Sequence, residues 1–189
     1  MTSRPNQRVL YVVVCGAGPA PYVDRLIKQA QQRGWQACVL ATPAALEFID
    51  AAHLEAITGY PVRSHHRKPG EPRGRGLPRA DAIVVAPATY NTINKWAAGI
   101  ADTYPLDVLA ECTGLGLPIV VLPFVNAALA ANRVFARSIQ ELRAAGVRVI
   151  HGPGQIEPHP PGTGSRLVDT FPWHLALDHL DQHAHGPGA

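Results

Sequence analysis

The sequence is poor in charge and in aromatic residues, which limits the partners it suits. Charged residues make up 16% of the 189 positions and aromatic residues 6%, and the formal net charge is +3. Much of the positive excess lies in one stretch, at Arg63, Arg67, Lys68, Arg73, Arg75 and Arg79. A nucleic-acid-binding domain needs a stronger basic surface and a recognisable motif, and no RNA- or DNA-binding motif accompanies this stretch. We therefore expect no nucleic-acid partner.

Long apolar runs and a full set of paired cysteines are also missing. No apolar run approaches the roughly 20 residues that span a bilayer, and residues 1–8 are polar where a signal peptide would be apolar. The three cysteines, Cys15, Cys38 and Cys112, cannot all pair within one chain, show no metal-ligand spacing and lie in or beside apolar segments. The sequence therefore predicts a cytoplasmic protein with buried thiols, no membrane contact and no metal site.

The common nucleotide-binding motifs are incomplete. Gly16 and Gly18 form half of a dinucleotide fingerprint, but Pro21 takes the place of the third glycine, and the acidic residue expected after the second strand is missing. No Gly-Lys-Ser or Gly-Lys-Thr tripeptide is present, which argues against a P-loop. A mononucleotide such as FMN needs only a phosphate cradle and a pocket for its ring, so the pattern remains compatible with FMN.

What the sequence does contain is five apolar segments of strand length, at residues 9–15, 36–41, 82–86, 118–123 and 147–150. Helical patterns separate them, and we expect helices over residues 43–50, 127–145 and 172–183 among others. Alternating strands and helices predict a parallel sheet with helices on both faces. The fold class is a three-layer flavodoxin-like (Rossmann-like) α/β fold with a five- or six-stranded sheet.

The length of the chain suits a single domain, residues 1–189. We expect a core over about residues 9–150, a C-terminal loop and helix over 151–183, and a frayed tail over 184–189. The strand order 2-1-3-4-5 would place a ligand at the carboxyl ends of the first and third strands, where the order reverses. Residues 16–21 and 87–92 follow those ends.

The stretch over residues 81–102 joins a buried strand to a helix. Its residues 82–86 suit a strand buried on both faces, and Pro87, which lacks a ladder donor, is expected to break that strand. Thr89, Asn91 and Thr92 stand where the helix begins, so side chains and free backbone N–H groups can converge on an anion. This arrangement predicts a phosphate cradle.

This stretch resembles the Pro-Ala-Ser/Thr-Ala-Asn-Thr signature of the homo-oligomeric flavin-containing cysteine decarboxylases, with Tyr90 in place of the usual alanine. The resemblance continues through residues 93–95 and 99–102 and extends more weakly over residues 9–150. It implies a homotrimer or a dodecamer of trimers, because the family builds its flavin site across subunit contacts. It also implies FMN as the cofactor, bound by Gly16, Ala17, Gly18, Pro19, Thr42, Phe48, Pro87, Ala88, Thr89, Asn91 and Thr92.

Two further segments carry the resemblance. Thr42, with Ala45 and Phe48, resembles the family's Thr-x-x-Ala-x-x-Phe pattern, in which the threonine lies near the flavin; an ordinary helix cap is the other reading of Thr42. Asn126 ends a Pro-Phe-Val-Asn segment that resembles the start of the family's Pro-x-Met-Asn-x-x-Met-Trp motif, in which the asparagine holds the substrate carboxylate. Asn126 is also a good helix N-cap, and both roles stay open.

The remainder of that motif differs from the family pattern. Val125, Leu129 and Ala130 replace the two methionines and the tryptophan, which implies a different substrate or none.

The family's catalytic histidine lies a few residues before the Ala-Asp that opens the third strand, and Arg73 occupies that place. A guanidinium stays protonated and cannot act as a base. His65 and His66, upstream in the same loop over residues 59–78, could supply the imidazole if the loop folds over the flavin. The alternative is that they are solvated loop histidines.

The resemblance implies FMN-dependent decarboxylation of a cysteine-like thiol carboxylate, in a peptide tail or in a phosphopantothenoylcysteine-type molecule. The candidate catalytic residues are His66, His65 and Asn126. In such an enzyme the flavin performs the redox work, and the protein supplies an acid or base and a carboxylate clamp. Arg73 and the altered substrate motif favour two alternatives: a flavoprotein with different chemistry, such as prenyl transfer to FMN or a small redox step, or a non-catalytic flavin-binding or regulatory subunit.

Overall fold

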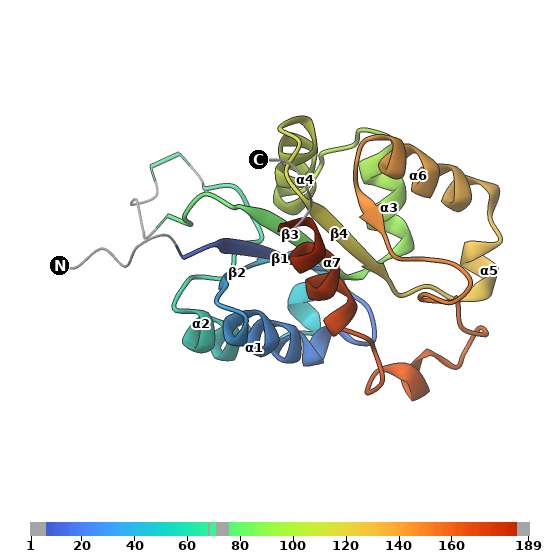
Figure 1. Cartoon of the computed structure of the whole chain (residues 1–189), viewed down its shortest axis with the longest axis horizontal. Coiled ribbons are helices and arrows are strands. Elements are labelled where there is room, and N and C mark those ends of the chain that lie inside the picture. The colour runs from blue at the N-terminus through green and yellow to red at the C-terminus, as the bar shows by residue number, and fades with distance from the viewer. Residues whose placement is uncertain (1–6, 68, 71–75, 185–189) are drawn as a thin grey trace.

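A five-stranded sheet forms the centre of the structure (Figure 1). The computed structural model describes residues 7–67, 69–70 and 76–184, and neighbouring strands of the sheet pair in parallel. The strand order β2-β1-β3-β4-β5 is the predicted one, so the flavodoxin-like α/β fold is confirmed. The strands are β1 (Val9–Val14), β2 (Gln36–Ala41), β3 (Ala82–Ala88), β4 (Ile119–Pro123) and β5 (Arg148–Val149).

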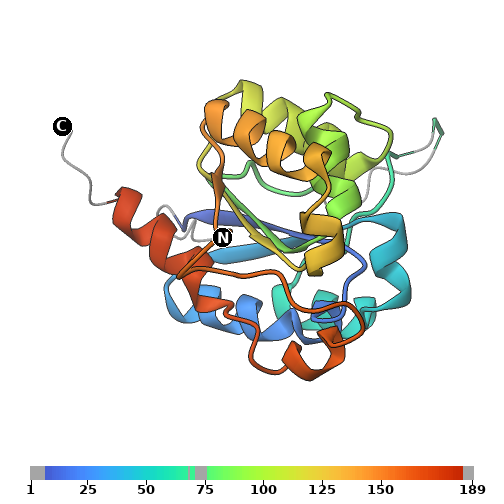
Figure 2. The ribbon, with the colours of Figure 1, turned by 90° about the vertical axis from the view of Figure 1, so that its right-hand side faces the viewer.

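Helices cover both faces of this sheet, which Figure 2 shows close to edge-on. One face carries α1 (Asp24–Gln32), α2 (Ala51–Thr58) and α7 (His174–Ala184), and the other carries α3 (Tyr90–Ala97), α4 (Tyr104–Gly114) and α6 (Arg133–Ala144). The shorter elements are α5 (Ala127–Ala130) and the 3-10 turns η1 (Ala20–Tyr22), η2 (Pro43–Glu47) and η3 (Gly164–Leu167).

The strands bury side chains on both faces. Val12 and Val84 pack in the core that α1 and α7 cover, whereas Val13 and Val85 pack in the core that α3, α4 and α6 cover. All four side chains are fully buried. Successive residues of a strand point to opposite faces, so strands this uniformly apolar need a helix layer on each side.

β3 continues through the proline that was expected to break it, and that prediction is wrong. Proline lacks only the donor: the carbonyl of Pro87 accepts from the amide of Cys15 at 3.2 Å, and the carbonyl of Ala88 accepts from the amide of Phe124 at 2.9 Å. After a register shift, Ala88 pairs with Pro123. The strand therefore reaches the edge of the sheet at which the neighbouring loops begin.

Two predicted helices differ in the structure because capping side chains interrupt them. The helix predicted over residues 127–145 is divided into α5 and α6, since the side chain of Asn132 accepts from the amide of Val134 at 3.1 Å and starts a new helix. The helix predicted over residues 43–50 is only the turn η2. A separate helix, α2, follows it, because the carboxylate of Asp50 accepts from the amide of His53 at 3.0 Å.

After β5 the chain forms an irregular segment, residues 151–171, which we call the C-terminal strap. The strap runs past the carboxyl end of β4 and pairs with the segment that follows β4 through a parallel bridge between Asn126 and His159 (Figure 1). It then leads into α7, which was predicted within two residues; residues 185–189 of the predicted tail lie outside the described residues.

Charged and apolar contacts together hold α7 against α1. Arg33, at the end of α1, lies 2.7 Å from a carboxylate oxygen of Asp178 and 2.9 Å from one of Asp181. Leu177 and Leu180 are buried in the core beneath α1. The last helix thus covers part of the sheet face on which α1 lies, which the strap does not cover.

The cysteines are free and buried, as predicted. Cys15 follows β1, Cys38 lies in β2 and Cys112 lies in α4. In the described part of the chain, no helix combines the length and the apolar character needed to cross a membrane.

We predict that Phe135→Ala lowers the free energy of unfolding by about 3–5 kcal/mol, because this fully buried ring leaves a cavity between α6 and α3. The ring stacks on Tyr90 with centroids 5.6 Å apart. Urea denaturation measures the change. The control is Gln140→Ala on the same helix, which is exposed and should alter stability by no more than about 0.5 kcal/mol. Equal losses in the two variants would contradict this view of the core.

Candidate functional site

The carboxyl ends of β1, β2 and β3 enclose a cavity of about 310 Å³, which we call the cradle pocket. Its lining comes from three loops and from the starts of α3 and α4: Gly16, Thr42, Pro43, Ala44, Thr89, Asn91, Thr92, Lys95, Thr103 and Leu106. Five of these residues, Gly16, Thr42, Thr89, Asn91 and Thr92, were predicted from the sequence. The structure therefore brings together segments that are far apart in the chain.

Thr89 organises the start of α3. Its hydroxyl oxygen accepts from the amide of Thr92 at 3.3 Å, and its hydroxyl lies 3.0 Å from that of Thr92. Both hydroxyls also bond the buried thiol of Cys15, whose pKa is raised by its burial, although these hydrogen bonds act in the opposite direction. The backbone amides of Tyr90 and Asn91 open the helix, where N–H groups have no intrahelical acceptor. The cradle pocket thus has a positive helix end in its wall.

The glycine loop after β1 packs tightly on both sides. A Cβ atom on Gly16 would lie 3.0 Å from the carbonyl oxygen of Ala44, so a side chain at this position would force η2 to shift. A Cβ on Gly18 would lie 3.1 Å from Val168 of the strap and 3.3 Å from the ring of Phe124. The loop is therefore enclosed between η2 and the strap.

Thr42 and Lys95 add polar groups to the cradle pocket. Thr42 precedes η2, but its side chain makes no capping hydrogen bond, so the reading of it as an ordinary cap is not supported. Lys95 lies one turn after Asn91 on the same side of α3, and its ammonium pairs with Asp102. Lys95 was not predicted as a ligand from the sequence, although its spacing of four residues from Asn91 indicates that both lie on the same side of a helix.

Other predicted cofactor residues do not line the cradle pocket. Ala17, Gly18 and Pro19 shape the glycine loop, and Pro87 and Ala88 belong to β3. Phe48 is 42% exposed beyond η2. Their roles as cofactor ligands stay predictions.

Asn126 caps α5. Its side-chain oxygen accepts from the amide of Leu129 at 2.9 Å, as the capping interpretation predicts. The carboxylate role stays a prediction, because the capping bond uses Oδ1 and leaves the Nδ2 amide as a donor.

His65 and His66 lie away from Asn126. Their segment runs along the outer edge of β2, where Arg63 forms a bridge with Leu40, and both histidines are exposed. Nε2 of His66 lies 3.8 Å from a carboxylate oxygen of Asp107 on α4. The two histidines line a separate cavity beside the edge of the sheet, and their catalytic role stays a prediction. Arg73 lies outside the described residues.

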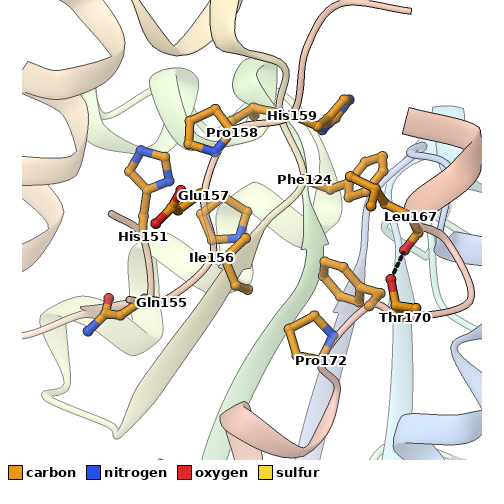
Figure 3. A pocket seen from close by; sticks show the side chains of 13 residues that line it. Phe124, His151, Gln155, Ile156, Glu157, Pro158, His159, Leu167, Thr170 and Pro172 are labelled. Atoms are coloured by element: carbon orange, nitrogen blue, oxygen red, sulfur yellow. Dashed lines mark hydrogen bonds between the residues drawn. The ribbon is translucent and has the colours of Figure 1, made fainter. Parts of the chain in front are cut away.

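A second pocket, of about 180 Å³, lies between the end of β4 and the strap (Figure 3). Phe124, Ile156 and Pro172 contribute apolar side chains to its lining, and His151 and His159 contribute imidazoles. Burial lowers the pKa of both, and the charge of nearby Arg143 lowers that of His151 further. The sequence reasoning missed these histidines, because the surrounding prolines and glycines indicate only a loop. In the described residues, no group of three His, Cys, Asp or Glu side chains could hold a metal ion.

The profile of the family described as Flavoprotein matches residues 2–165, which include every segment around the cradle pocket. The chain belongs to the Flavoprotein family. Among curated proteins of related sequence are the coenzyme A biosynthesis bifunctional proteins CoaBC of Escherichia coli K12 and Vibrio vulnificus YJ016, each 30% identical, over 144 and 153 residues. These alignments cover 74% and 79% of this chain but 34% and 37% of those proteins. This flavoprotein chain therefore spans about a third of the length of the curated relatives it matches.

Solved structures share the fold. The FMN binding protein AtHal3 aligns over 96% of this chain and 100% of its own, with a TM-score of 0.69 at 17% identity. Two FMN-dependent cysteine decarboxylases, SpaF and TvaF, align over 90% and 92% of this chain and 98% of their own. Their TM-scores are 0.63 and 0.65, each at 24% identity. At such identities the likeness concerns the flavodoxin-like fold.

We predict that Thr89→Ala lowers the free energy of unfolding by about 1 kcal/mol, because it removes the side-chain cap of α3. Thr89→Ser keeps the capping oxygen and should retain most of the stability. Urea denaturation of both variants measures the difference. If alanine and serine gave equal stability, the cap would not be contributing.

Proposed function

We propose that this chain binds FMN in the cradle pocket and uses it to decarboxylate a cysteine-like thiol carboxylate. The observation that carries the proposal is the convergence of the loops after β1, β2 and β3 on the start of α3, at the point where the strand order reverses. Family membership supports a flavin ligand, and relatives of the same fold are named as FMN proteins.

The chemistry of the cradle pocket suits the phosphate of FMN. The N-terminus of α3 presents backbone N–H groups and the positive end of the helix dipole, which favour an anion. Thr42, Asn91 and Lys95 also line the pocket, and the ammonium of Lys95 pairs with Asp102. This donor set, with Gly16 allowing close backbone approach, would hold the phosphate end of the cofactor.

The substrate class follows from the relatives and from the residues near the pockets. SpaF and TvaF are FMN-dependent cysteine decarboxylases by name, which supports a cysteine at the end of a peptide or in a phosphopantothenoylcysteine-type molecule. Bound FMN would supply the oxidation that turns the thiol into a thioaldehyde, so that the carbon–carbon bond to the carboxylate can break. The chain's own residues have to bind that carboxylate and handle the protons.

Asn126 suits the carboxylate because its two side-chain atoms can serve separate roles. Oδ1 caps α5, and this bond fixes the direction of the amide. Nδ2 would then donate to the substrate carboxylate. Capping and substrate binding are compatible on one side chain.

Assembly and compartment are part of the proposal. We infer a homotrimer or a dodecamer of trimers that acts in the cytoplasm. Leu129 and Val134 place apolar side chains, 40% and 42% exposed, on α5 and α6 near Asn126. A subunit contact there would cover them.

We predict that the purified protein shows the absorption spectrum of oxidised flavin, and that Gly16→Ala weakens FMN binding by forcing η2 away from the glycine loop. The wild type should also remove the mass of one carbon dioxide from a cysteine-ended peptide or from phosphopantothenoylcysteine, as followed by mass spectrometry. Flavin without mass loss on either compound would contradict decarboxylation and favour other flavin chemistry or a binding role. No flavin in the presence of excess FMN would contradict the whole proposal.

We predict that Asn126→Asp lowers kcat/KM by about 10- to 100-fold, because a carboxylate keeps the capping oxygen but replaces the amide donor with a negative charge. Stability should change little. Asn132→Asp is the matched control, since it makes the same change at the cap of α6 and should keep wild-type kcat/KM. Unchanged kcat/KM in Asn126→Asp would leave that residue with a capping role only.

A further inference from the structure

The strap places one imidazole directly beside Asn126. The amide of Ala127 donates to the carbonyl of His159 at 2.7 Å, and the amide of His159 donates to the carbonyl of Val125 at 3.3 Å. These two bonds form a parallel bridge with Asn126 at its centre. Backbone pairing, rather than a mobile side chain, therefore sets the position of His159.

The side chains of this bridge project in one direction. Alternate residues of an extended segment point to the same side, so Phe124 and Asn126 share a face, and a bridged residue on a neighbouring segment shares it too. The ring of His159 lies against that of Phe124, with centroids 4.7 Å apart and planes inclined by 32° (Figure 3). This contact agrees with a common face for Phe124, Asn126 and His159.

The same face adjoins the glycine loop of the cradle pocket. The Cε1 atom of Phe124 would lie 3.3 Å from a Cβ atom on Gly18 and 3.3 Å from one on Gly164. A Cβ on Gly164 would also lie only 2.8 Å from Nε2 of His159. The ring of Phe124 thus lies between the imidazole of His159 and the glycine loop. Because Gly164 has no side chain, it leaves room for the imidazole.

The surroundings of His159 keep its imidazole neutral near pH 7. Burial lowers its pKa, and the end of β4 and the glycine loop present no titratable side chain to it. The other titratable and charged residues of the strap are His151, Glu157, Arg166 and Asp169. A neutral imidazole can accept a proton, which is what a thiol must lose before it is oxidised.

We propose that His159 is the general base for the thiol of the substrate whose carboxylate Asn126 holds. The inference rests on the proposed function. The imidazole would take the S–H proton, and bound FMN would supply the two-electron oxidation by accepting a hydride from the adjacent carbon, which leaves a carbon–sulfur double bond. When the bond to the carboxylate breaks and carbon dioxide leaves, the electron pair of that bond would form the carbon–carbon double bond of an enethiolate. The sulfur recovers its proton from the imidazolium, so the products are an enethiol, carbon dioxide and two-electron-reduced flavin.

The test compares single variants of the full-length, FMN-loaded protein with a cysteine-ended peptide as substrate. His159→Gln should lower kcat by about 10²- to 10⁴-fold with unchanged flavin content and Tm. Gly164→Ala keeps the imidazole but displaces it, and should lower kcat by about tenfold or more. His174→Gln removes an exposed histidine at the start of α7 and should behave as wild type.

The pH dependence gives a readout that a purely structural role would not move. A base works only when unprotonated, so wild-type kcat/KM should fall as the pH drops through the pKa of His159, below the ordinary histidine value of about 6.5. His159→Gln should lose this acid limb. Independently of turnover, NMR titration of the imidazole protons should show His151 and His159 with pKa values below the ordinary histidine value, and the signal of His159 should be missing from His159→Gln.

The outcomes separate the two hypotheses. Wild-type kcat and an unchanged acid limb in His159→Gln would overturn the role of His159 while leaving the decarboxylase function intact. Loss of activity in His66→Gln, with His159→Gln still active, would assign the base to the loop histidine instead. No release of carbon dioxide by the wild type would overturn the proposed function, and the role of His159 with it.

Discussion

The reversal of strand order at β1 is the constraint on which the other features depend. β2 and β3 lie on opposite sides of β1, so the chain leaves β1 toward α1 on one face of the sheet and leaves β3 toward α3 on the other. The bond from the amide of Cys15 to the carbonyl of Pro87 is the last between these two strands before the chains part. The cradle pocket opens beyond it, and its position follows from topology rather than from any one side chain.

Much of the fold could be predicted because its signals are local. Each strand is apolar over its whole length, so the parallel sheet and its order follow from the alternation with helical segments. Caps such as Asn132 and Asp50 were harder to place, because alanine-rich sequence on either side of them has high helix propensity. The prediction that Pro87 ends the strand was wrong for a related reason. The sequence shows that proline lacks an N–H donor, but whether its carbonyl accepts a hydrogen bond depends on the neighbouring strand.

The residues of the candidate site fall into the same two groups, those that local signals in the sequence place and those whose position depends on distant parts of the chain. Thr42, Thr89 and Asn91 follow strand ends, so their convergence could be expected from the topology. His159 could not be placed from the sequence, because its proline-rich surroundings indicate a loop but say nothing about the segment with which that loop pairs. His159 lies beside Asn126 because two distant parts of the chain pair with each other, and the periodicity of apolar residues in the sequence does not predict such pairing. The predictions for His65 and His66 depended in the same way on the path of a long loop.

The strap is fastened by two unlike attachments. Backbone bonds join His159 to the segment after β4, whereas farther along Arg25 pairs with Asp169 at 3.0 Å and Arg33 pairs with Asp178 and Asp181 of α7. Ion pairs as exposed as these weaken as dissolved salt screens them, and backbone ladders are affected far less. Rising ionic strength would therefore weaken the attachment at Asp169, while the backbone bonds at His159 and the buried ring of Phe171 keep the strap in place. The wall of the pocket beneath the strap thus has one attachment that responds to dissolved salt and others that do not.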